Sequence, residues 1–281
     1  MNENKSNVSK IGFMQGRLSP IVDNKIQAFP WANWEEEFSS ANSLDLRIME
    51  WTLDHENLDN NPIMNLEGRD KIRALSSQFN ISIPSLTGDC FMQAPFWKSH
   101  GLEKENLEKI FLSIIDSCQQ LDIESIVVPL VDGGSIKTKQ ERSSLFSFFE
   151  RNESHIKKTG VNILFESDYA PVDLKNFINE LNPKGFGINY DIGNSAAMGF
   201  DPIDEFSAYG DRIMNVHIKD REFNGFTVPL GNGNANFPLV FKLLDQFSYR
   251  GNYILQTARS ETGDHLGYIR EFKEKTLDWL Y

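Results

Sequence analysis

VNILFES at 161–167, FGINYDIG at 186–193 and IMNVHIKD at 213–220 are short apolar runs that follow one another in the second half of the chain. Side chains of a β-strand alternate between its two faces, so every second residue shares a face. In each run this alternation gathers polar residues on one face and places one of them at or near the carboxyl end of the run. The polar side chains predicted to end these strands are Glu166, Asp191 and His217.

Eight runs of this kind recur along the chain, with amphipathic stretches between them. Their starts lie 25 to 43 residues apart, which is room for one strand, one helix and two loops. This alternation is typical of the α/β class and predicts a (β/α)8 TIM barrel formed by a single domain over 11–281. An open, doubly wound sheet is the alternative. The runs begin at Ile11, Leu46, Ile81, Glu124, Val161, Phe186, Ile213 and Asn252.

The stretches between the runs carry apolar residues at helical spacing. Helices are predicted to begin near Asn33, where the asparagine would be the N-cap, near Asn65, and after Leu102. Pro202 and Pro238 lie where further helices could start, because proline is tolerated in the first helical turn. The longest of these stretches, after Leu102, is predicted to pack into the core.

Composition limits the classes of function. Lys+Arg 28 against Asp+Glu 40 gives a formal net charge of −12. A surface of this charge is a poor match for nucleic acid, whose phosphates are neutralised by clustered lysine and arginine. With 40% hydrophobic residues and no long apolar run, neither disorder nor a membrane span is expected. We therefore expect a small-molecule partner, and no nucleic acid or membrane partner.

The start of the chain carries no apolar targeting segment. Residues 1–10 are polar and rich in Asn and Ser, and are expected to form a loosely ordered segment before the barrel. A cytoplasmic location follows as an expectation. Cys90 and Cys118 have no metal-binding spacing and are predicted to be reduced thiols.

The barrel prediction brings four polar side chains to one place. Catalytic groups of TIM barrels lie at the carboxyl ends of the strands, and the eighth run adds Gln256 to Glu166, Asp191 and His217. Carboxylate, imidazole and amide carbonyl ligands suit one divalent cation with open positions for substrate. We expect Mn²⁺, Mg²⁺, Co²⁺ or Zn²⁺, with a closed structural zinc site disfavoured because no thiolate is available. Taken singly, a buried His217 is more often a hydrogen-bonded core histidine than a ligand, and only the combination of the four side chains favours a metal site.

Seven short motifs, in this order and spacing, resemble the xylose isomerase-like TIM-barrel superfamily, and in particular its sugar phosphate isomerase/epimerase branch. The resemblance spans nearly the whole chain after residue 10. It implies a metal at the carboxyl-terminal mouth of the barrel, held by Glu166, Asp191 and His217, with the fourth family position at Gln256. The motifs are GFMQGRLSP at 12–20, MEW at 49–51, FESD at 165–168, DIGN at 191–194, VHIKDR at 216–221, PLGNGNANF at 229–237 and YILQTARS at 253–260.

Gln256 departs from the family pattern, because the epimerases usually carry a second glutamate there. An amide has no proton to exchange near neutral pH, so a symmetric two-base epimerisation is in doubt. The resemblance implies a metal-dependent sugar or sugar phosphate isomerase or epimerase, with Glu166 as the base and Asp220 or Glu50 as candidate further acid. A non-catalytic, sugar-binding barrel that has lost the second acid is the alternative.

Other charged residues near the strand ends are candidates for substrate binding. Lys219, Arg221 and Arg259 would suit a phosphate or carboxylate, although ion pairs with neighbouring acids are as plausible. Glu50 is a candidate to hold a sugar hydroxyl or to orient a ligand, with a structural ion pair as plausible, and Asp220 is a further candidate for substrate binding. The endonucleases of the family need additional histidine ligands that this chain lacks, which also argues against DNA. A homo-oligomer is possible, and the aromatic residues that follow the first strand, Phe29, Trp31 and Trp34, are expected to pack rather than to stack on a sugar.

Overall fold

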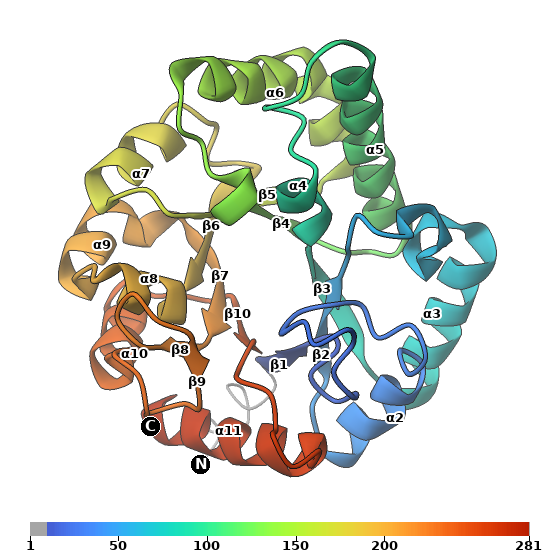
Figure 1. Ribbon diagram of the computed structural model, residues 1–281, viewed down its shortest axis with the longest axis vertical. Coiled ribbons are helices and arrows are strands. Elements are labelled where there is room, and N and C mark those ends of the chain that lie inside the picture. Colours follow the sequence, from blue (N-terminus) through green and yellow to red (C-terminus); the bar gives the residue numbers. More distant parts are fainter. Residues whose placement is uncertain (1–9, 281) are drawn as a thin grey trace.

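A closed barrel of parallel strands forms the centre of the computed structural model, which describes residues 10–280 (Figure 1). Around the barrel the strands follow the order β1, β10, β7, β6, β5, β4, β3, β2, and β2 pairs with β1 to close the ring. The predicted (β/α)8 TIM barrel is therefore confirmed. The barrel strands are β1 (Ile11–Met14), β2 (Ile48–Thr52), β3 (Ser82–Thr87), β4 (Ser125–Leu130), β5 (Asn162–Ser167), β6 (Phe186–Asp191), β7 (Ile213–Ile218) and β10 (Asn252–Leu255).

Helices surround this barrel as an outer ring (Figure 1). An additional hairpin, β8 (Asp220–Arg221) with β9 (Thr227–Val228), follows β7, and short 3₁₀ turns cover Leu58–Asn60, Pro62–Met64, Asp132–Gly134 and Gly210–Arg212. In the described part of the chain no helix has the length and apolarity needed to cross a membrane. The helices are α2 (Glu36–Ser43), α3 (Leu66–Phe79), α4 (Asp89–Gln93), α5 (Gly101–Gln120), α6 (Lys139–Thr159), α7 (Pro171–Ile178), α8 (Ile192–Met198), α9 (Pro202–Tyr209), α10 (Phe237–Gln246) and α11 (His265–Leu280).

The predicted helix starts agree with the structure except at the first helix. Asn65 caps α3 by accepting the Gly68 N–H at 2.8 Å, and Pro202 is the first residue of α9. α2 begins at Glu36 rather than near Asn33, so the predicted N-cap was wrong. The side chain of Asn33 donates to the Glu36 carboxylate at 2.9 Å, and within residues 10–280 it accepts no backbone N–H. The predicted loose segment falls on residues 1–9, which lie outside the described residues, and on Lys10.

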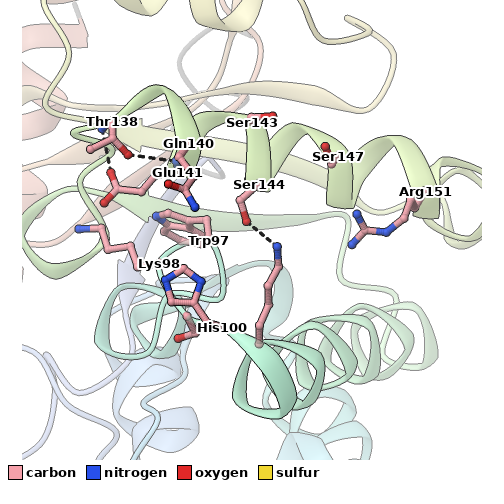
Figure 2. Close-up of a pocket in the computed structure, with 12 residues that line it drawn as sticks. Trp97, Lys98, His100, Thr138, Gln140, Glu141, Ser143, Ser144, Ser147 and Arg151 are labelled. Atoms are coloured by element: carbon pink, nitrogen blue, oxygen red, sulfur yellow. Dashed lines mark hydrogen bonds between the residues drawn. The ribbon is translucent and has the colours of Figure 1, made fainter.

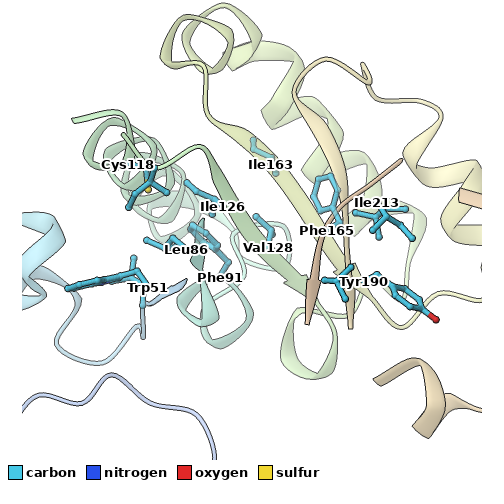
Figure 3. Packing of buried hydrophobic residues seen from close by; sticks show 14 of the residues in the cluster. Trp51, Leu86, Phe91, Cys118, Ile126, Val128, Ile163, Phe165, Tyr190 and Ile213 are labelled. Carbon is cyan, nitrogen blue, oxygen red and sulfur yellow. The ribbon is translucent and has the colours of Figure 1, made fainter. Parts of the chain in front are cut away.

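Phenylalanine rings fill the layer between the barrel and helices α5 and α6, and Figure 3 shows part of this packing. Phe148 is fully buried, and its ring centroid lies 4.5 Å from that of Phe96 and 5.2 Å from that of Phe111. Rings at these separations add favourable aromatic contacts to the burial of apolar area. Cys118 is a free, buried thiol in the same cluster, as predicted.

Replacing Phe148 with alanine should therefore lower the free energy of unfolding by about 3–5 kcal/mol, because the ring leaves a cavity that the rigid barrel cannot close. Urea unfolding followed by far-UV circular dichroism measures the change. Phe226→Ala is the matched control, since that ring is 85% exposed and its loss should change stability by less than about 0.5 kcal/mol. Equal effects of the two substitutions would contradict this account of the core.

Candidate metal centre and active site

Three adjacent strands deliver the metal-ligating residue types to one point inside the barrel. Glu166 is the next-to-last residue of β5, Asp191 ends β6, and the register of β6 with β7 places Asp191 directly beside His217. All three side chains are buried, and one ligand atom from each lies within 4.8 Å of the others. The structure therefore brings together three of the four side chains predicted as ligands, in a group that could hold a metal ion.

Glu50 sets the orientation of the His217 ring. The Nε2 atom of His217 lies 2.7 Å from Glu50 Oε1, which leaves Nδ1 facing Glu166 Oε2 at 3.2 Å. Glu50 also accepts hydrogen bonds from Ser85, Thr87 and, at 2.8 Å, Asn215. A carboxylate bonded to the distal nitrogen is the usual arrangement that orients a ligating histidine. Glu50 is fully buried and is held inside the barrel, apart from any surface that a substrate could reach.

Electrostatics of the Glu50 and His217 pair favour its charged form in the absence of a cation. Burial alone would lower the pKa of His217, but the charges and hydrogen bonds of Glu50 and Glu166 outweigh burial and raise it to about 10. Burial likewise opposes the ionisation of Glu50, yet the charge of His217 and the surrounding donors hold the pKa of Glu50 below its ordinary value. The pair is thus a buried, hydrogen-bonded ion pair.

Two asparagine side chains hold the Glu166 carboxylate. Asn189 donates to Oε2 at 2.8 Å and Asn194 donates to Oε1 at 2.7 Å. Burial would raise the pKa of Glu166, but the hydrogen bond to His217 and the charges of His217 and Lys219 keep it below the ordinary value. Glu166 is therefore an ionised carboxylate with fixed orientation, as a general base requires.

Gln256 lies beside a lysine rather than among the three clustered residues. It follows β10, and its Oε1 atom is 3.5 Å from Lys219 Nζ, which in turn pairs with Asp191 Oδ2 at 3.1 Å. The positive charge of Lys219 is thus placed between the amide and the nearest carboxylate of the cluster.

A cavity of about 700 Å³ opens next to this cluster. Glu166, Lys219 and Gln256 line it, together with polar side chains from the segments that follow several strands, among them Asp89 at the start of α4 and Asn194 in α8. A volume of this size accommodates a small polar ligand. Glu166 belongs both to the buried cluster and to the cavity wall, so a metal ion held by the cluster and a ligand in the cavity would share this residue.

Comparison with known proteins agrees with this geometry. A family model described as "Xylose isomerase-like TIM barrel" matches residues 38–280. The chain belongs to the xylose isomerase-like TIM barrel family.

The chain is also similar to individual proteins of known name or structure. A putative L-ribulose-5-phosphate 3-epimerase SgbU of Haemophilus influenzae is 24% identical over 79% of this chain and 83% of that protein. Among solved structures, the IOLI protein with a bound zinc atom superposes with a TM-score of 0.75 at 17% identity, over 96% of this chain and 98% of that one. A barrel of this family from Mycobacterium smegmatis in complex with magnesium has a TM-score of 0.68 at 15% identity, over 96% of each chain.

The remaining residues predicted for substrate binding have partners within the protein. Arg221 lines the cavity, where its guanidinium donates to the Gly225 carbonyl at 2.7 Å and to Asn194 Oδ1 at 2.8 Å. Arg259 donates to the carbonyl oxygens of Gly16 and Ser19, so it fastens the loop after β1. Of these two arginines, only Arg221 faces the cavity.

Asp220 supports the loop that follows the β8–β9 hairpin. Its fully buried carboxylate accepts backbone N–H groups from Gly231 at 2.8 Å, Gly233 at 2.9 Å and Ala235 at 3.1 Å. A side chain at position 233 would not fit, because a Cβ there would lie 2.2 Å from Asp220 Oδ1. The LGNGN stretch at 230–234 thus wraps around Asp220.

Of the aromatic residues that follow β1, Phe29 and Trp34 pack as predicted. Phe29 is fully buried, and its ring centroid lies 5.5 Å from that of Trp51, while Trp34 lies 5.8 Å from Trp51. Trp31 is 37% exposed, and its ring forms a T-shaped pair with that of Phe29, with the ring centroids 4.8 Å apart.

Three side chains at the site lie outside the predicted set. Asn189 shares a strand face with Asp191, two residues before it, so the strand alternation was a signal for it. Asn194 lies in the first turn of α8 and Asp89 is the first residue of α4, where strand alternation gives no orientation. Their positions depend on how α8 and α4 begin.

A second cavity, of about 570 Å³, lies between α5 and α6 (Figure 2). Its polar side chains bond to one another: Lys104 donates to Ser144 at 2.7 Å, and Thr138 and Glu141 form a capping box at the start of α6. None of the three clustered ligand residues lines it. The chemistry described above therefore belongs to the cavity at the mouth of the barrel.

Asp220→Ala should lower the free energy of unfolding by about 1–3 kcal/mol, because three part-buried backbone hydrogen bonds lose their acceptor. Urea unfolding measures the loss. A variant of unchanged stability whose only defect is a raised KM for sugar would show instead that Asp220 serves the substrate, as the sequence suggested.

Proposed function

We propose that this protein is a metal-dependent sugar isomerase or epimerase that moves a proton off a substrate carbon through Glu166. One observation carries the proposal: Glu166, Asp191 and His217 converge in a buried cluster, and Glu166 also lines the adjoining cavity. The family and the relative named as a 3-epimerase support a carbohydrate substrate.

The residues present fit one divalent cation. Two carboxylates and an imidazole meet with donor atoms within 4.8 Å of one another, and the remaining ring nitrogen of His217 is already held by Glu50. Glu166, Asp191 and His217 would hold the ion. The Gln256 carbonyl, 3.5 Å from Lys219 Nζ, is the candidate for a fourth ligand. A bound divalent cation polarises the carbonyl and hydroxyl oxygens of a sugar. Relatives with zinc and with magnesium support this class of ion.

Glu166 supplies the base. Its ionised carboxylate faces the cavity, and Asn189 and Asn194 fix both oxygens, so a substrate C–H next to a carbonyl can lose its proton to a preoriented group. Return of that proton to the neighbouring carbon is an aldose–ketose isomerisation. Its return to the opposite face of the same carbon is an epimerisation, and it needs a second acid.

A sugar-binding barrel without turnover is the second candidate. One observation favours it: Gln256 stands where the family's epimerases usually have a glutamate, and an amide neither gives nor takes a proton near neutral pH. The two candidates differ in whether Glu166 has a kinetic role.

Metal binding can be measured without knowledge of the substrate. Mn²⁺ added to about 100 times its Kd should stabilise the metal-stripped protein by about 2.7 kcal/mol, seen as a rise in Tm. Asp191→Asn should abolish most of that rise. Asp70→Asn, a surface carboxylate on α3 with 66% exposure, is the matched control and should retain it. If none of Mn²⁺, Mg²⁺, Co²⁺ and Zn²⁺ raised the Tm, the proposal that the protein uses a metal would be wrong.

Turnover tests the base. Glu166→Gln keeps the shape of the side chain but removes its basicity, so kcat on any sugar that the wild type converts should fall by about 100- to 10,000-fold. The assay follows interconversion of a panel of aldoses and ketoses by chromatography. A wild-type protein that binds these sugars but converts none of them would favour the sugar-binding barrel.

The charges in the cavity favour an uncharged sugar over a sugar phosphate. Its three cationic side chains each face a partner: Lys219 pairs with Asp191, Arg221 with the Gly225 carbonyl and Asn194, and Lys25 with Glu56 at 3.2 Å. A phosphate would need a free cation and would meet further acids in the wall. These acids are Asp132, Glu166 and Asp168; Asp89 also lines the cavity, but its raised pKa reduces its charge.

We therefore expect kcat/KM for free ketoses to exceed that for the corresponding phosphates by about 10-fold or more, a difference of roughly 1.4 kcal/mol in transition-state binding. Matched pairs of free and phosphorylated sugars, assayed at one ionic strength, give the ratio. A preference for the phosphates would mean that Lys25, Lys219 or Arg221 exchanges its present partner for substrate.

A further inference from the structure

One acid in the cavity wall has no donor to hold it. Asp89 follows β3 as the first residue of α4, is 8% exposed, and lines the cavity together with Glu166 and Gln256. Within residues 10–280, no group donates a hydrogen bond to its carboxylate, whereas Glu166 is held by two asparagines. A nearly buried carboxylate with no donor is costly as an anion, so this position favours the neutral acid.

The carboxylates near Asp89 act in the same direction as its burial. Burial, and then the carboxylates of Asp54 and Glu166, raise its pKa, while Lys219 and His217 oppose the rise; the result is a pKa of about 8. Both carboxylate oxygens of Asp54 already accept hydrogen bonds, one from the Phe29 N–H and one from the Gln93 side-chain amide. Its burial in the cavity wall and the lack of a donor thus both favour the neutral carboxyl form of Asp89.

The two acids that the sequence suggested are not available for this task. Glu50 is fully buried with its oxygens bonded to His217, Ser85, Thr87 and Asn215, and Asp220 accepts three backbone N–H groups of its loop. Neither lines the cavity. The Gln256 amide, which does line it, has no proton to give. An epimerisation started by Glu166 therefore lacks an acid unless another wall residue supplies one.

We propose that Asp89 is this acid, the second catalytic residue of an epimerisation, and that it takes the place of the glutamate absent at position 256. The inference rests on the proposed function. Glu166 on β5 and Asp89, which begins the helix after β3, line the same cavity, and only β4 separates their two strands in the barrel. The proposal requires a substrate in this cavity to turn one face of the reacting carbon toward Glu166 and the other toward Asp89.

Protons and electrons balance over the cycle. The Glu166 carboxylate takes the proton of the C–H bond next to the carbonyl, and the bonding electron pair moves to the carbonyl oxygen to give an enediolate. The carbonyl then reforms as the Asp89 O–H gives its proton to the opposite face of the same carbon, which yields the epimer. Glu166 is left protonated and Asp89 ionised, and exchange with water in the open cavity restores both.

Asp89→Asn separates the two proton transfers. The metal-loaded protein is incubated in D₂O with a panel of free ketopentoses and ketohexoses, and NMR follows both loss of the C–H signal and appearance of the epimer. In the variant we expect epimer formation to fall by about 100-fold or more, with KM within about threefold of wild type, while Glu166 continues to exchange the substrate proton for deuterium. Glu166→Gln should lose both signals, and Asp70→Asn should lose neither.

Other results would overturn the assignment. If Asp89→Asn forms the epimer at close to the wild-type rate, Asp89 is not the acid. If the substitution raises KM and leaves kcat unchanged, Asp89 binds a sugar hydroxyl instead. Asp89→Glu guards against misfolding, since a longer acid should recover part of the epimer rate if proton donation is the role. Failure of the wild type to exchange any substrate proton would instead overturn the proposed function, and this inference with it.

Discussion

Glu50 and His217 form a buried contact in the barrel interior on which the whole site depends. A carboxylate and an imidazole placed at zero exposure are stable only if they bond to each other and to further donors, and Ser85, Thr87 and Asn215 supply those donors. This contact uses the Nε2 atom of His217 and so turns Nδ1 toward Glu166. Closure of the barrel makes the contact possible, because β2 and β7 are far apart in sequence and both end at the same mouth.

The regular part of this arrangement could be predicted from the sequence. Strand alternation has a period of two, and a parallel barrel gathers all carboxyl ends at one edge, so Glu166, Asp191 and His217 had to approach one another once eight strands were counted. The strand starts agree with the structure within two residues, from Ile11 in β1 to Asn252 in β10. Asn33 was misplaced as a cap because the turns before α2 depend on contacts distant in sequence.

Long side chains and loop residues could not be predicted in the same way. Arg259 lies near a strand end, as a substrate ligand would, yet its guanidinium reaches back to carbonyls of the loop after β1. Asp220 lies next to the metal-ligand motif, yet it serves the backbone of a hairpin and its loop. Asp89 carries no local signal, because its surroundings are assembled from Asp54, Glu166 and Lys219, on three other strands or strand ends. The strand-end residues of this site therefore follow from side-chain alternation, whereas the orientations of residues after the strand ends depend on contacts between distant parts of the chain.

The central claim, that strands β5, β6 and β7 build one cation site, is tested most directly by anomalous X-ray scattering from crystals of the protein grown with Mn²⁺. The account predicts a single strong peak within bonding distance, about 2.0–2.3 Å, of Glu166, Asp191 and His217 Nδ1. Strong density only at other acids of the cavity wall, such as Asp132 or Asp168, or no peak at the barrel mouth at saturating Mn²⁺, would contradict it.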